Sequence, residues 1–510
     1  MVASVVIELT AVGLGLLAVR WNGTARPGPA PASAMAWRAC GAAAECATLP
    51  VPADHARPTG PTIDLSLARH RAQDPAARRG VLLINLGGPG IRGTDQITDP
   101  AKLVKWPSAV RQHFDLIGFD PRGVPGSSYL HCGPHEPWRT RPRGSAEFDR
   151  KVTARGAWLR DCASRTGDLF NHLDGRSVAA DVEAIRVALG EEKINWIGYS
   201  YGTLFGLTYA EMFPNRIRAM VLDGVVDHST PTERLAVTRA VATEHAFNDF
   251  AKWCAGESTC ALHGRDVGAL WDGLAKRAGQ APVDVDGTSY SDDALAGAVV
   301  ERVTSARDWP ELAGLLAKAS PNAASQPAPN RPTASHPAAS HPAGGRSAAS
   351  RAAESPHPAP DFNVGAMIDV GDCSDYPSRL NTFNEISAFV ADIVRQAPRF
   401  GSFVGWQDLG KCAQWPFPVP NPPGPIELTD LPPVLLVNAT GDAVTPLTDA
   451  RTVAGQLPGS SSVMVDADEH GVYGYGVKCA DTAVERFLVD LARPPDPTDC
   501  DGSPLVPHGG

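Results

Sequence analysis

The sequence has few charged residues and lacks any run of clustered lysine and arginine. Its 510 residues include 46 basic and 56 acidic side chains, which gives a formal net charge of −10 at pH 7. A nucleic-acid-binding protein normally carries a basic surface, so this balance argues against a nucleic-acid partner. Only 20% of the residues are charged and 43% are hydrophobic, so the chain can bury a large core and is not disordered throughout.

Paired cysteine ligands of the kind that bind zinc are also missing. The ten cysteines are scattered and none shows the C-x2-4-C spacing, so we expect no metal site and no cofactor. An even number of cysteines fits disulfide bonds in an exported protein, although free buried thiols are an alternative. The sequence allows several connectivities, and we adopt sequential pairing as the hypothesis: Cys40 with Cys46, Cys132 with Cys162, Cys254 with Cys260, Cys373 with Cys412, and Cys479 with Cys500.

Long apolar runs are absent except at the start of the chain. Residues 2–19 are almost entirely apolar, and Ala32-Ser33-Ala34 offers an A-x-A cleavage pattern. We therefore expect residues 1–35 to be a signal peptide, although no basic residue precedes the apolar run and Glu8 lies within it. The run is close to the length that spans a bilayer, so an uncleaved N-terminal anchor is the alternative. Both readings predict a protein that is secreted or associated with the cell envelope.

The rest of the sequence alternates short apolar segments with helical patterns. A strand buried in a parallel sheet has a continuous apolar run, whereas a surface helix has apolar residues every three or four positions. We expect strands at residues 81–86, 114–120, 194–198, 219–222, 434–437 and 462–465, and helices at 177–189, 204–213 and 482–491. This alternation predicts an α/β protein with a mostly parallel sheet and helices on both faces.

About 200 residues interrupt the alternation. We expect a core in two parts, residues 36–228 and 428–510, separated by a large and mainly helical cap insertion at residues 229–427. Within the insertion, residues 320–360 contain 12 Ala, 9 Pro and 7 Ser but no Leu, Ile, Val, Met or aromatic residue. Because such a segment has nothing to bury, we expect it to be disordered.

The pentapeptide Gly198-Tyr199-Ser200-Tyr201-Gly202 matches the G-x-S-x-G motif of a nucleophile elbow. It follows an expected strand and precedes an expected helix, which is the context that this tight turn requires. The turn needs small flanking residues and exposes the serine hydroxyl at the edge of the sheet. The motif predicts Ser200 as the nucleophile of an α/β-hydrolase fold.

A serine hydroxyl needs an adjacent base, and the base needs an orienting carboxylate. In this fold the acid and the histidine follow the serine in that order. Asp442 follows the strand at 434–437, and His470 follows the next strand, 28 residues further on. We predict Asp442 as the acid and His470 as the base, with Asp223 and Asp227 as alternative positions for the acid.

Acyl transfer also requires N–H donors for the developing oxyanion. Gly87-Gly88-Pro89-Gly90 follows the first parallel strand, and its glycines allow the backbone to approach a substrate. We predict the N–H groups of Gly88 and Tyr201 as the donors, although a plain turn is the alternative for the glycine loop. Arg122, which follows the next strand, is interpreted as structural and paired with a carboxylate.

Together these motifs resemble the secreted tripeptidyl-aminopeptidase-like α/β-hydrolases of actinobacteria, relatives of the proline iminopeptidases. The resemblance covers nearly the whole chain apart from the N-terminal leader and the Pro/Ala-rich insert. It rests on E-C-A-T-L-P-V-P (45–52), L-G-G-P-G (86–90), G-F-D-P-R-G-V (118–124), G-Y-S-Y-G-T (198–203), Y-A-x-x-F-P (209–214), L-D-G-V-V-D (222–227), C-S-D-Y-P (373–377) and V-N-A-T-G-D-A-V-T-P (437–446).

The resemblance implies a Ser–Asp–His exopeptidase that has a cap over its site and releases short peptides, such as tripeptides, from free N-termini. By motif position it implies the same triad of Ser200, Asp442 and His470. The sequence departs from the family pattern at Ile91-Arg92-Gly93 after the glycine loop and at Pro125 after the D-P-R-G-V motif, and both positions lie near the expected oxyanion and substrate side. The alternatives are a carboxylesterase or lipase with the same triad, and an inactive protein that keeps the fold.

An aminopeptidase must also bind a free α-ammonium group. Because burying that charge without a partner is costly, the site requires a carboxylate at a fixed distance from Ser200. Asp372 and Asp375 stand out in the expected cap, and we predict them as substrate-binding residues. The alternative is that they cap a helix or face solvent.

The Pro/Ala-rich insert generates a prediction of its own. Deletion of residues 326–353 should change the melting temperature and the activity little, because the segment has no apolar anchor and loop-closure entropy grows slowly with length. Thermal unfolding and hydrolysis assays of the deletion variant test this, and a fall of many degrees would show that the insert packs against the cap.

Overall fold

The computed structural model describes residues 35–505, except residues 42, 135–137, 321–361 and 429. The expected signal peptide and the Pro/Ala-rich insert therefore lie outside the described residues, apart from Met35 and Ser320 at their edges. Within the described part of the chain, none of the helices combines the length and apolar character needed to cross a membrane.

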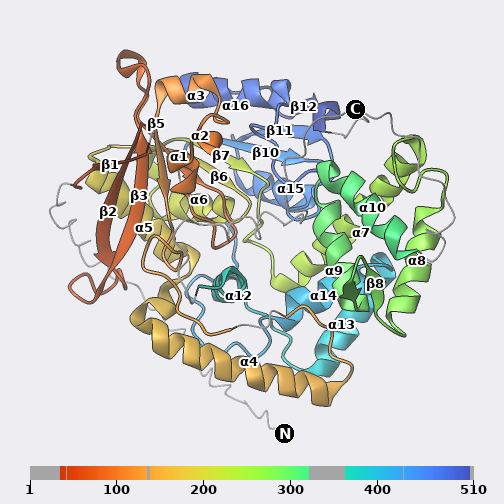
Figure 1. Cartoon of the computed structure of the whole chain (residues 1–510). Coiled ribbons are helices and arrows are strands. Elements are labelled where there is room, and N and C mark those ends of the chain that lie inside the picture. Colours follow the sequence, from red (N-terminus) through yellow and green to blue (C-terminus); the bar gives the residue numbers. More distant parts are fainter. Residues whose placement is uncertain (1–34, 42, 135–137, 321–361, 429, 506–510) are drawn as a thin grey trace, which may run out of the picture. The chain divides into compact units, whose positions relative to one another are not determined.

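The described residues form a ten-stranded sheet with the order β1-β2-β3-β5-β4-β6-β7-β10-β11-β12 (Figure 1). The strands are β1 (Arg38–Gly41), β2 (Ala44–Pro52), β3 (Thr62–His70), β4 (Val81–Asn85), β5 (Asp115–Phe119), β6 (Ile194–Tyr199), β7 (Ile217–Asp223), β10 (Val434–Ala439), β11 (Ser461–Asp466) and β12 (Thr498–Asp501). Pairs among β1, β2, β3 and β5 are antiparallel, and the other pairs are parallel. This confirms the predicted mostly parallel sheet.

The extent to which a strand is buried explains whether the sequence pattern predicted it. All residues of β4 and β10 are buried, so these strands appear in the sequence as continuous apolar runs. Buried and accessible residues largely alternate along β2 and β3, which pair with each other near the edge of the sheet. Neither strand contains a continuous apolar run, so the sequence pattern did not indicate these two strands.

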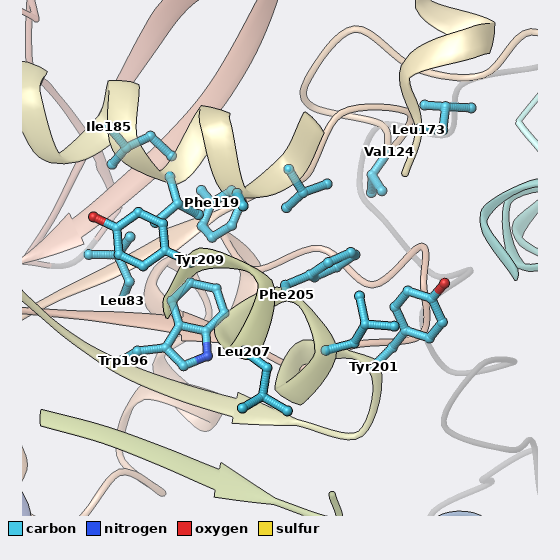
Figure 2. Packing of buried hydrophobic residues seen from close by; sticks show 14 of the residues in the cluster. Leu83, Phe119, Val124, Leu173, Ile185, Trp196, Tyr201, Phe205, Leu207 and Tyr209 are labelled. Atoms are coloured by element: carbon cyan, nitrogen blue, oxygen red, sulfur yellow. The ribbon is translucent and has the colours of Figure 1, made fainter. Parts of the chain in front are cut away.

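Helices cover both faces of the sheet, as predicted. The helices that pack on the strands include α5 (Gly175–Leu189), α6 (Tyr201–Met212), α15 (Leu447–Gln456) and α16 (Lys478–Asp490), and α3 (Ser108–His113) packs against α16. On β4, Leu83 packs in the hydrophobic cluster that contains Ile185 of α5, whereas Leu82 packs in the cluster that contains Val484 of α16. Figure 2 shows the first of these clusters, where Trp196 of β6 lies beside Tyr209 of α6.

The local sequence determines where helix α5 begins and ends. The carboxylate of Asp174 accepts hydrogen bonds from the backbone N–H groups of Arg176 and Ser177 at the start of α5. Gly190 ends the helix in the left-handed conformation at φ 72°, which glycine adopts without strain. These caps fix both ends of the helix that packs against α6.

Seven helices lie among the described residues between β7 and β10. They are α7 (Thr232–Gly256), α8 (Val267–Ala278), α9 (Asp292–Val303), α10 (Trp309–Ala319), α12 (Val364–Asp375), α13 (Phe383–Gln396) and α14 (Gly401–Gly410), accompanied by a hairpin of β8 (Val283–Val285) and β9 (Thr288–Tyr290). Most of them share a separate hydrophobic cluster. Phe148 of α4 (Ser145–Thr166), which precedes β6, joins that cluster and lies 6.2 Å from Trp406 between ring centroids.

Five disulfide bonds connect the cysteines in the predicted sequential pairs, so the pairing hypothesis is confirmed. Cys373 in α12 is bonded to Cys412, and this pair closes a loop of 39 residues. Cys40 and Cys46 close a loop of only 6 residues at the first hairpin.

The prediction for Arg122 is also confirmed. Its guanidinium is fully buried and donates to both carboxylate oxygens of Asp181, at 2.7 Å and 2.6 Å. It donates further to the carbonyl oxygens of Pro52, Ala53 and His172. Arg122 thus connects the end of β2, the segment before α5 and α5 itself.

We expect the Cys373–Cys412 bond to stabilise the fold more than the Cys40–Cys46 bond does. A bond that closes a longer loop removes more conformational entropy from the unfolded chain. Replacing Cys373 and Cys412 with Ser should lower the free energy of unfolding by about 2–4 kcal/mol, measured by denaturant unfolding without reductant. The double Ser variant of Cys40 and Cys46 is the matched control, and an equal loss in both would contradict this expectation.

Candidate active site

Ser200 lies in a sharp turn between β6 and α6. Its backbone has φ 53° and ψ −126°, a conformation that residues other than glycine rarely adopt. The glycines two positions before and after Ser200 have no room for a side chain, because a Cβ on Gly198 would lie 2.3 Å from the carbonyl oxygen of Gly202. A Cβ on Gly202 would lie 2.5 Å from the carbonyl oxygen of Asn85. This geometry is that of a nucleophile elbow.

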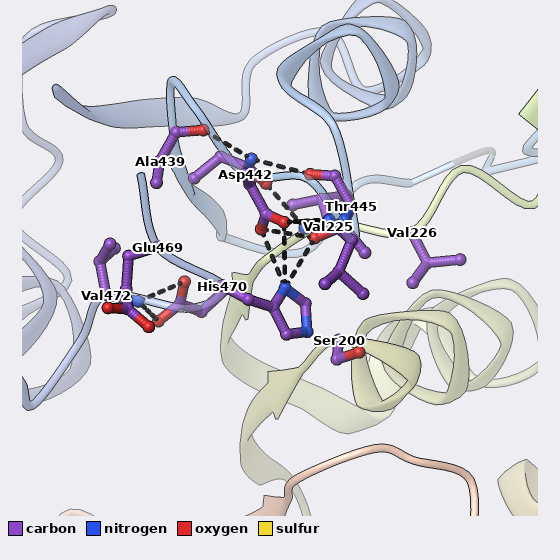
Figure 3. A network of polar contacts seen from close by, with 12 residues as sticks. Ser200, Val225, Val226, Ala439, Asp442, Thr445, Glu469, His470 and Val472 are labelled. Atoms are coloured by element: carbon purple, nitrogen blue, oxygen red, sulfur yellow. Dashed lines mark hydrogen bonds and ion pairs between the residues drawn. The ribbon is translucent and has the colours of Figure 1, made fainter. Parts of the chain in front are cut away.

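Asp442 and His470 meet at the carboxyl ends of β10 and β11. Nδ1 of His470 lies 2.9 Å from Oδ2 and 3.2 Å from Oδ1 of Asp442, whose side chain is buried. Figure 3 shows the imidazole between the Asp442 carboxylate and the Ser200 side chain. The structure therefore brings together the three residues that the sequence predicted as a triad.

The Asp442 carboxylate is held by its own loop. The backbone N–H groups of Val444 and Thr445 donate to Oδ1 at 2.8 Å and 2.9 Å, and the Thr445 hydroxyl donates to Oδ2 at 2.8 Å. The same hydroxyl oxygen lies 3.3 Å from Nδ1 of His470. Thr445 was not among the residues predicted from the sequence, although a threonine three residues after an aspartate is a known pattern for such local hydrogen bonds.

The two alternative acids have other partners. The Asp223 carboxylate accepts hydrogen bonds from the backbone N–H groups of Val472 and Tyr473, and burial raises its pKa to about 7. Asp227 accepts from the backbone N–H and the hydroxyl of Ser229. Asp223 thus holds the loop after His470, and among these three carboxylates it is Asp442 that contacts the imidazole.

Asp223 also contacts the nucleophile turn through its backbone. The carbonyl oxygen of Asp223 accepts a hydrogen bond of 2.9 Å from the N–H of Ser200. One buried residue at the end of β7 therefore connects the Ser200 turn with the loop that carries His470. No sequence pattern indicated this role, because it depends on strand neighbours.

The two predicted oxyanion donors lie at the same cavity as Ser200. Gly88 and Tyr201 both line it, and its volume is about 290 Å³. The loop after β4 packs directly on the elbow, since a Cβ on Gly87 would lie 2.6 Å from the backbone nitrogen of Tyr201. The loop is thus close enough to provide a donor beside the one at the start of α6.

The helical region between β7 and β10 builds the opposite wall of this cavity. Residues of α7, α12 and α14 line it, together with Trp138, Arg139, Val444, Thr445 and Asp449. A volume near 300 Å³ is at the small end of the range for small-molecule sites. A cavity of this size beside Ser200 suits a short substrate segment.

The two predicted substrate-binding carboxylates are both engaged within the protein. Asp372 lines the cavity, but its carboxylate forms an ion pair with Lys411. Asp375 is absent from the described cavity lining, and it accepts hydrogen bonds from the Tyr201 hydroxyl at 2.6 Å and from Asn421 at 2.8 Å. The expectation that Asp375 faces the substrate is therefore corrected: its side chain is buried and holds the residue after Ser200.

The helical region also contacts the residue before His470. The Glu469 carboxylate accepts hydrogen bonds from the Ser305 hydroxyl at 2.8 Å and from the Arg307 guanidinium at 2.8 Å and 2.9 Å. The backbone N–H of Ala306 donates to the carbonyl oxygen of Asp468 at 2.7 Å. These contacts attach the segment between α9 and α10 to the histidine loop, and the sequence gave no signal for them.

Comparisons with known proteins agree with this geometry. Residues 80–312 match a family model described as "alpha/beta hydrolase fold", and residues 397–500 match one described as "TAP-like protein". The chain is 30% identical over 476 residues to "Serine protease Hip1" of Mycobacterium tuberculosis (strain H37Rv), covering 89% of this chain and 87% of that protein.

Two further relatives have names that differ in the activity they state. "Tripeptidyl aminopeptidase" of Streptomyces lividans is 28% identical over 464 residues, covering 87% of this chain and 81% of the relative. "Carboxylesterase B" of M. tuberculosis (strain H37Rv) is 30% identical over 476 residues, covering 90% of this chain and 86% of the relative. With the fold, the elbow and these matches in agreement, the chain belongs to the family of tripeptidyl-aminopeptidase-like α/β hydrolases.

Proposed function

We propose that this protein is an exported serine aminopeptidase that releases short peptides, such as tripeptides, from substrates with a free N-terminus. The observation that carries the proposal is the Asp442–His470 pair, whose imidazole lies beside the strained turn at Ser200, and Ser200 itself lines a cavity. The relatives named as a serine protease and a tripeptidyl aminopeptidase support peptide bonds as the target.

In the proposed mechanism, Nε2 of His470 removes the proton from the Ser200 hydroxyl as Oγ attacks the substrate carbonyl carbon. The N–H groups of Gly88 and Tyr201 stabilise the oxyanion that forms. The imidazolium, which is oriented and stabilised by Asp442, then protonates the leaving amine, and an acyl-enzyme remains on Ser200. Water activated by His470 hydrolyses this ester and regenerates the serine.

We further propose that residues 229–427 act as a cap that closes the site. In support of this, residues of α7, α12 and α14 line the Ser200 cavity, and Ser305 and Arg307 are bonded to Glu469 beside the histidine. An exopeptidase needs a cavity with a closed end so that only chain termini enter.

An extracellular or cell-envelope location is part of the proposal. Five disulfide bonds fit an oxidising environment and are rare in cytosolic proteins. The apolar segment at residues 2–19 supports export by a cleaved signal peptide or a retained anchor.

A carboxylesterase is the second candidate. The same triad and oxyanion donors hydrolyse esters, and the relative named "Carboxylesterase B" is as similar to this chain as the relative named as a protease. The two activities differ in whether the substrate must carry a free amino group.

A substrate panel tests the proposed function. Mono-, di- and tripeptidyl anilides with free N-termini, their N-acetylated forms and nitrophenyl esters should be compared by kcat/KM. We expect the free tripeptidyl anilide to be preferred, and Ser200→Ala to lose both turnover and labelling by a fluorophosphonate probe, with a rate loss of several orders of magnitude. Efficient ester hydrolysis without peptide cleavage would support the esterase instead, and labelling that persisted in Ser200→Ala would contradict the assignment of the nucleophile.

The pH profile tests the assignment of the acid. Burial lowers the pKa of His470, but the Asp442 carboxylate outweighs this effect, so the net pKa lies above its ordinary value of 6.5. Because the base must be neutral, kcat/KM should fall as the pH drops through a value above 6.5. Asp442→Asn should reduce kcat by about 10⁴-fold, as removal of a triad carboxylate does elsewhere, and should move the acid limb to lower pH.

Asp223→Asn is the matched control for that experiment. The asparagine side-chain oxygen can still accept a hydrogen bond from one of the two backbone N–H groups that Asp223 binds. We therefore expect a smaller loss of kcat than in Asp442→Asn. A larger loss in Asp223→Asn than in Asp442→Asn would transfer the role of acid to Asp223.

A further inference from the structure

The carboxylates that line the Ser200 cavity differ in whether a cation neutralises them. Four acidic residues lie in the described lining, and three of them have a basic partner. Asp372 is paired with Lys411, Asp408 with Arg239 at 2.7 Å, and Asp369 with Arg155 at 3.9 Å. These three are therefore already balanced in charge before a substrate binds.

Asp449 is the exception. It is only 6% exposed, and no ion pair to it is found among the described residues. Its carboxylate contacts two hydroxyl groups, that of Thr448 at 3.3 Å, a weak hydrogen bond, and that of Thr238. Burial and the nearby Asp227 carboxylate raise the pKa of Asp449 to about 7, although Arg239, itself bonded to Asp408, opposes this rise.

Among the described residues, hydroxyl groups thus contact the Asp449 carboxylate, and no cation forms an ion pair with it. A buried carboxylate without a cation is costly, and a ligand cation that enters the cavity would offset that cost. An α-ammonium group supplies one positive charge together with three N–H donors. The N-terminus of a peptide whose scissile bond lies at Ser200 would bring this group into the same cavity.

We propose that Asp449 binds the α-ammonium group of the substrate and so makes the enzyme specific for free N-termini. This inference rests on the proposed aminopeptidase function. It assigns the role that the sequence analysis gave to Asp372 and Asp375 to a residue outside the expected cap.

The position of Asp449 in the chain strengthens the inference. It lies in the first turn of α15, and its backbone N–H donates to the carbonyl oxygen of Pro446 at 2.8 Å. The loop before α15 contains Asp442, which contacts His470, and Thr445, whose hydroxyl donates a hydrogen bond to Asp442. The carboxylate proposed for the amine therefore lies at the start of the helix that directly follows the loop of the proposed acid.

Substitution of Asp449 tests the inference. Asp449→Asn should lower kcat/KM for a tripeptidyl anilide with a free N-terminus by about 30-fold or more, mainly by raising KM. A loss of this size is expected when a buried charge pair loses one partner. Hydrolysis of a small neutral nitrophenyl ester and fluorophosphonate labelling of Ser200 should change by less than about twofold. Asp449→Glu, which retains the charge, should recover part of the loss.

Asp392→Asn is the control for net charge. Asp392 lies on α13, is exposed and is paired with Arg395, so its removal changes the protein charge equally without reaching the cavity. It should leave both substrates unaffected. If Asp449→Asn folds poorly in a thermal unfolding assay, Asp449→Ser provides a smaller uncharged side chain for the same comparison.

An acidic residue in the first turn also stabilises a helix, and the assay separates this role from recognition of the amine. Equal losses on the peptide and the ester would overturn the inference, as would an unchanged preference for free amines in Asp449→Asn. Wild-type enzyme that cleaves N-acetylated and free peptides equally well would overturn the proposed function itself, and the inference with it.

Discussion

A single buried residue, Asp223, connects the two loops on which the candidate site depends. Its backbone carbonyl accepts the N–H of Ser200, and its carboxylate accepts the N–H groups of Val472 and Tyr473. A positive φ at a residue such as Ser200 costs about 1–3 kcal/mol and persists only where neighbouring structure holds it. The end of β7 therefore holds both the strained turn at Ser200 and the loop after His470. These contacts connect the two segments that carry the Ser200 hydroxyl and the His470 imidazole.

The helical region between β7 and β10 is attached to both of those loops. Asp375 of α12 accepts a hydrogen bond from the hydroxyl of Tyr201, the residue after the nucleophile, and Arg307 binds Glu469, the residue before His470. A shift of these helices would therefore displace Tyr201 and Glu469, the residues next to Ser200 and His470. The cavity wall and the triad geometry are thus parts of one hydrogen-bonded structure rather than independent modules.

Much of the core followed from local sequence, because its strands are buried on both faces. The continuous apolar runs at β4, β6 and β10 and the glycines of the elbow were sufficient to place Ser200, and chain order then placed Asp442 and His470. The antiparallel strands β2 and β3 were missed because one of their faces is partly accessible, so their patterns alternate. α4 was not assigned to the helical region, since its packing on Trp406 depends on contacts distant in sequence.

The sequence by itself determined the chemistry: a serine in an elbow, an acid and a histidine after later strands, and cysteines that pair with their neighbours in order. Only the tertiary structure decided which of the carboxylates near Ser200 have partners within the protein. Asp372 and Asp375 looked suitable in the sequence, but Lys411 neutralises the first and Tyr201 and Asn421 engage the second. Whether a buried carboxylate has a cation or a hydrogen-bond donor beside it depends on side chains from distant parts of the chain, which only packing brings together. Residue type and spacing in the sequence do not encode that proximity.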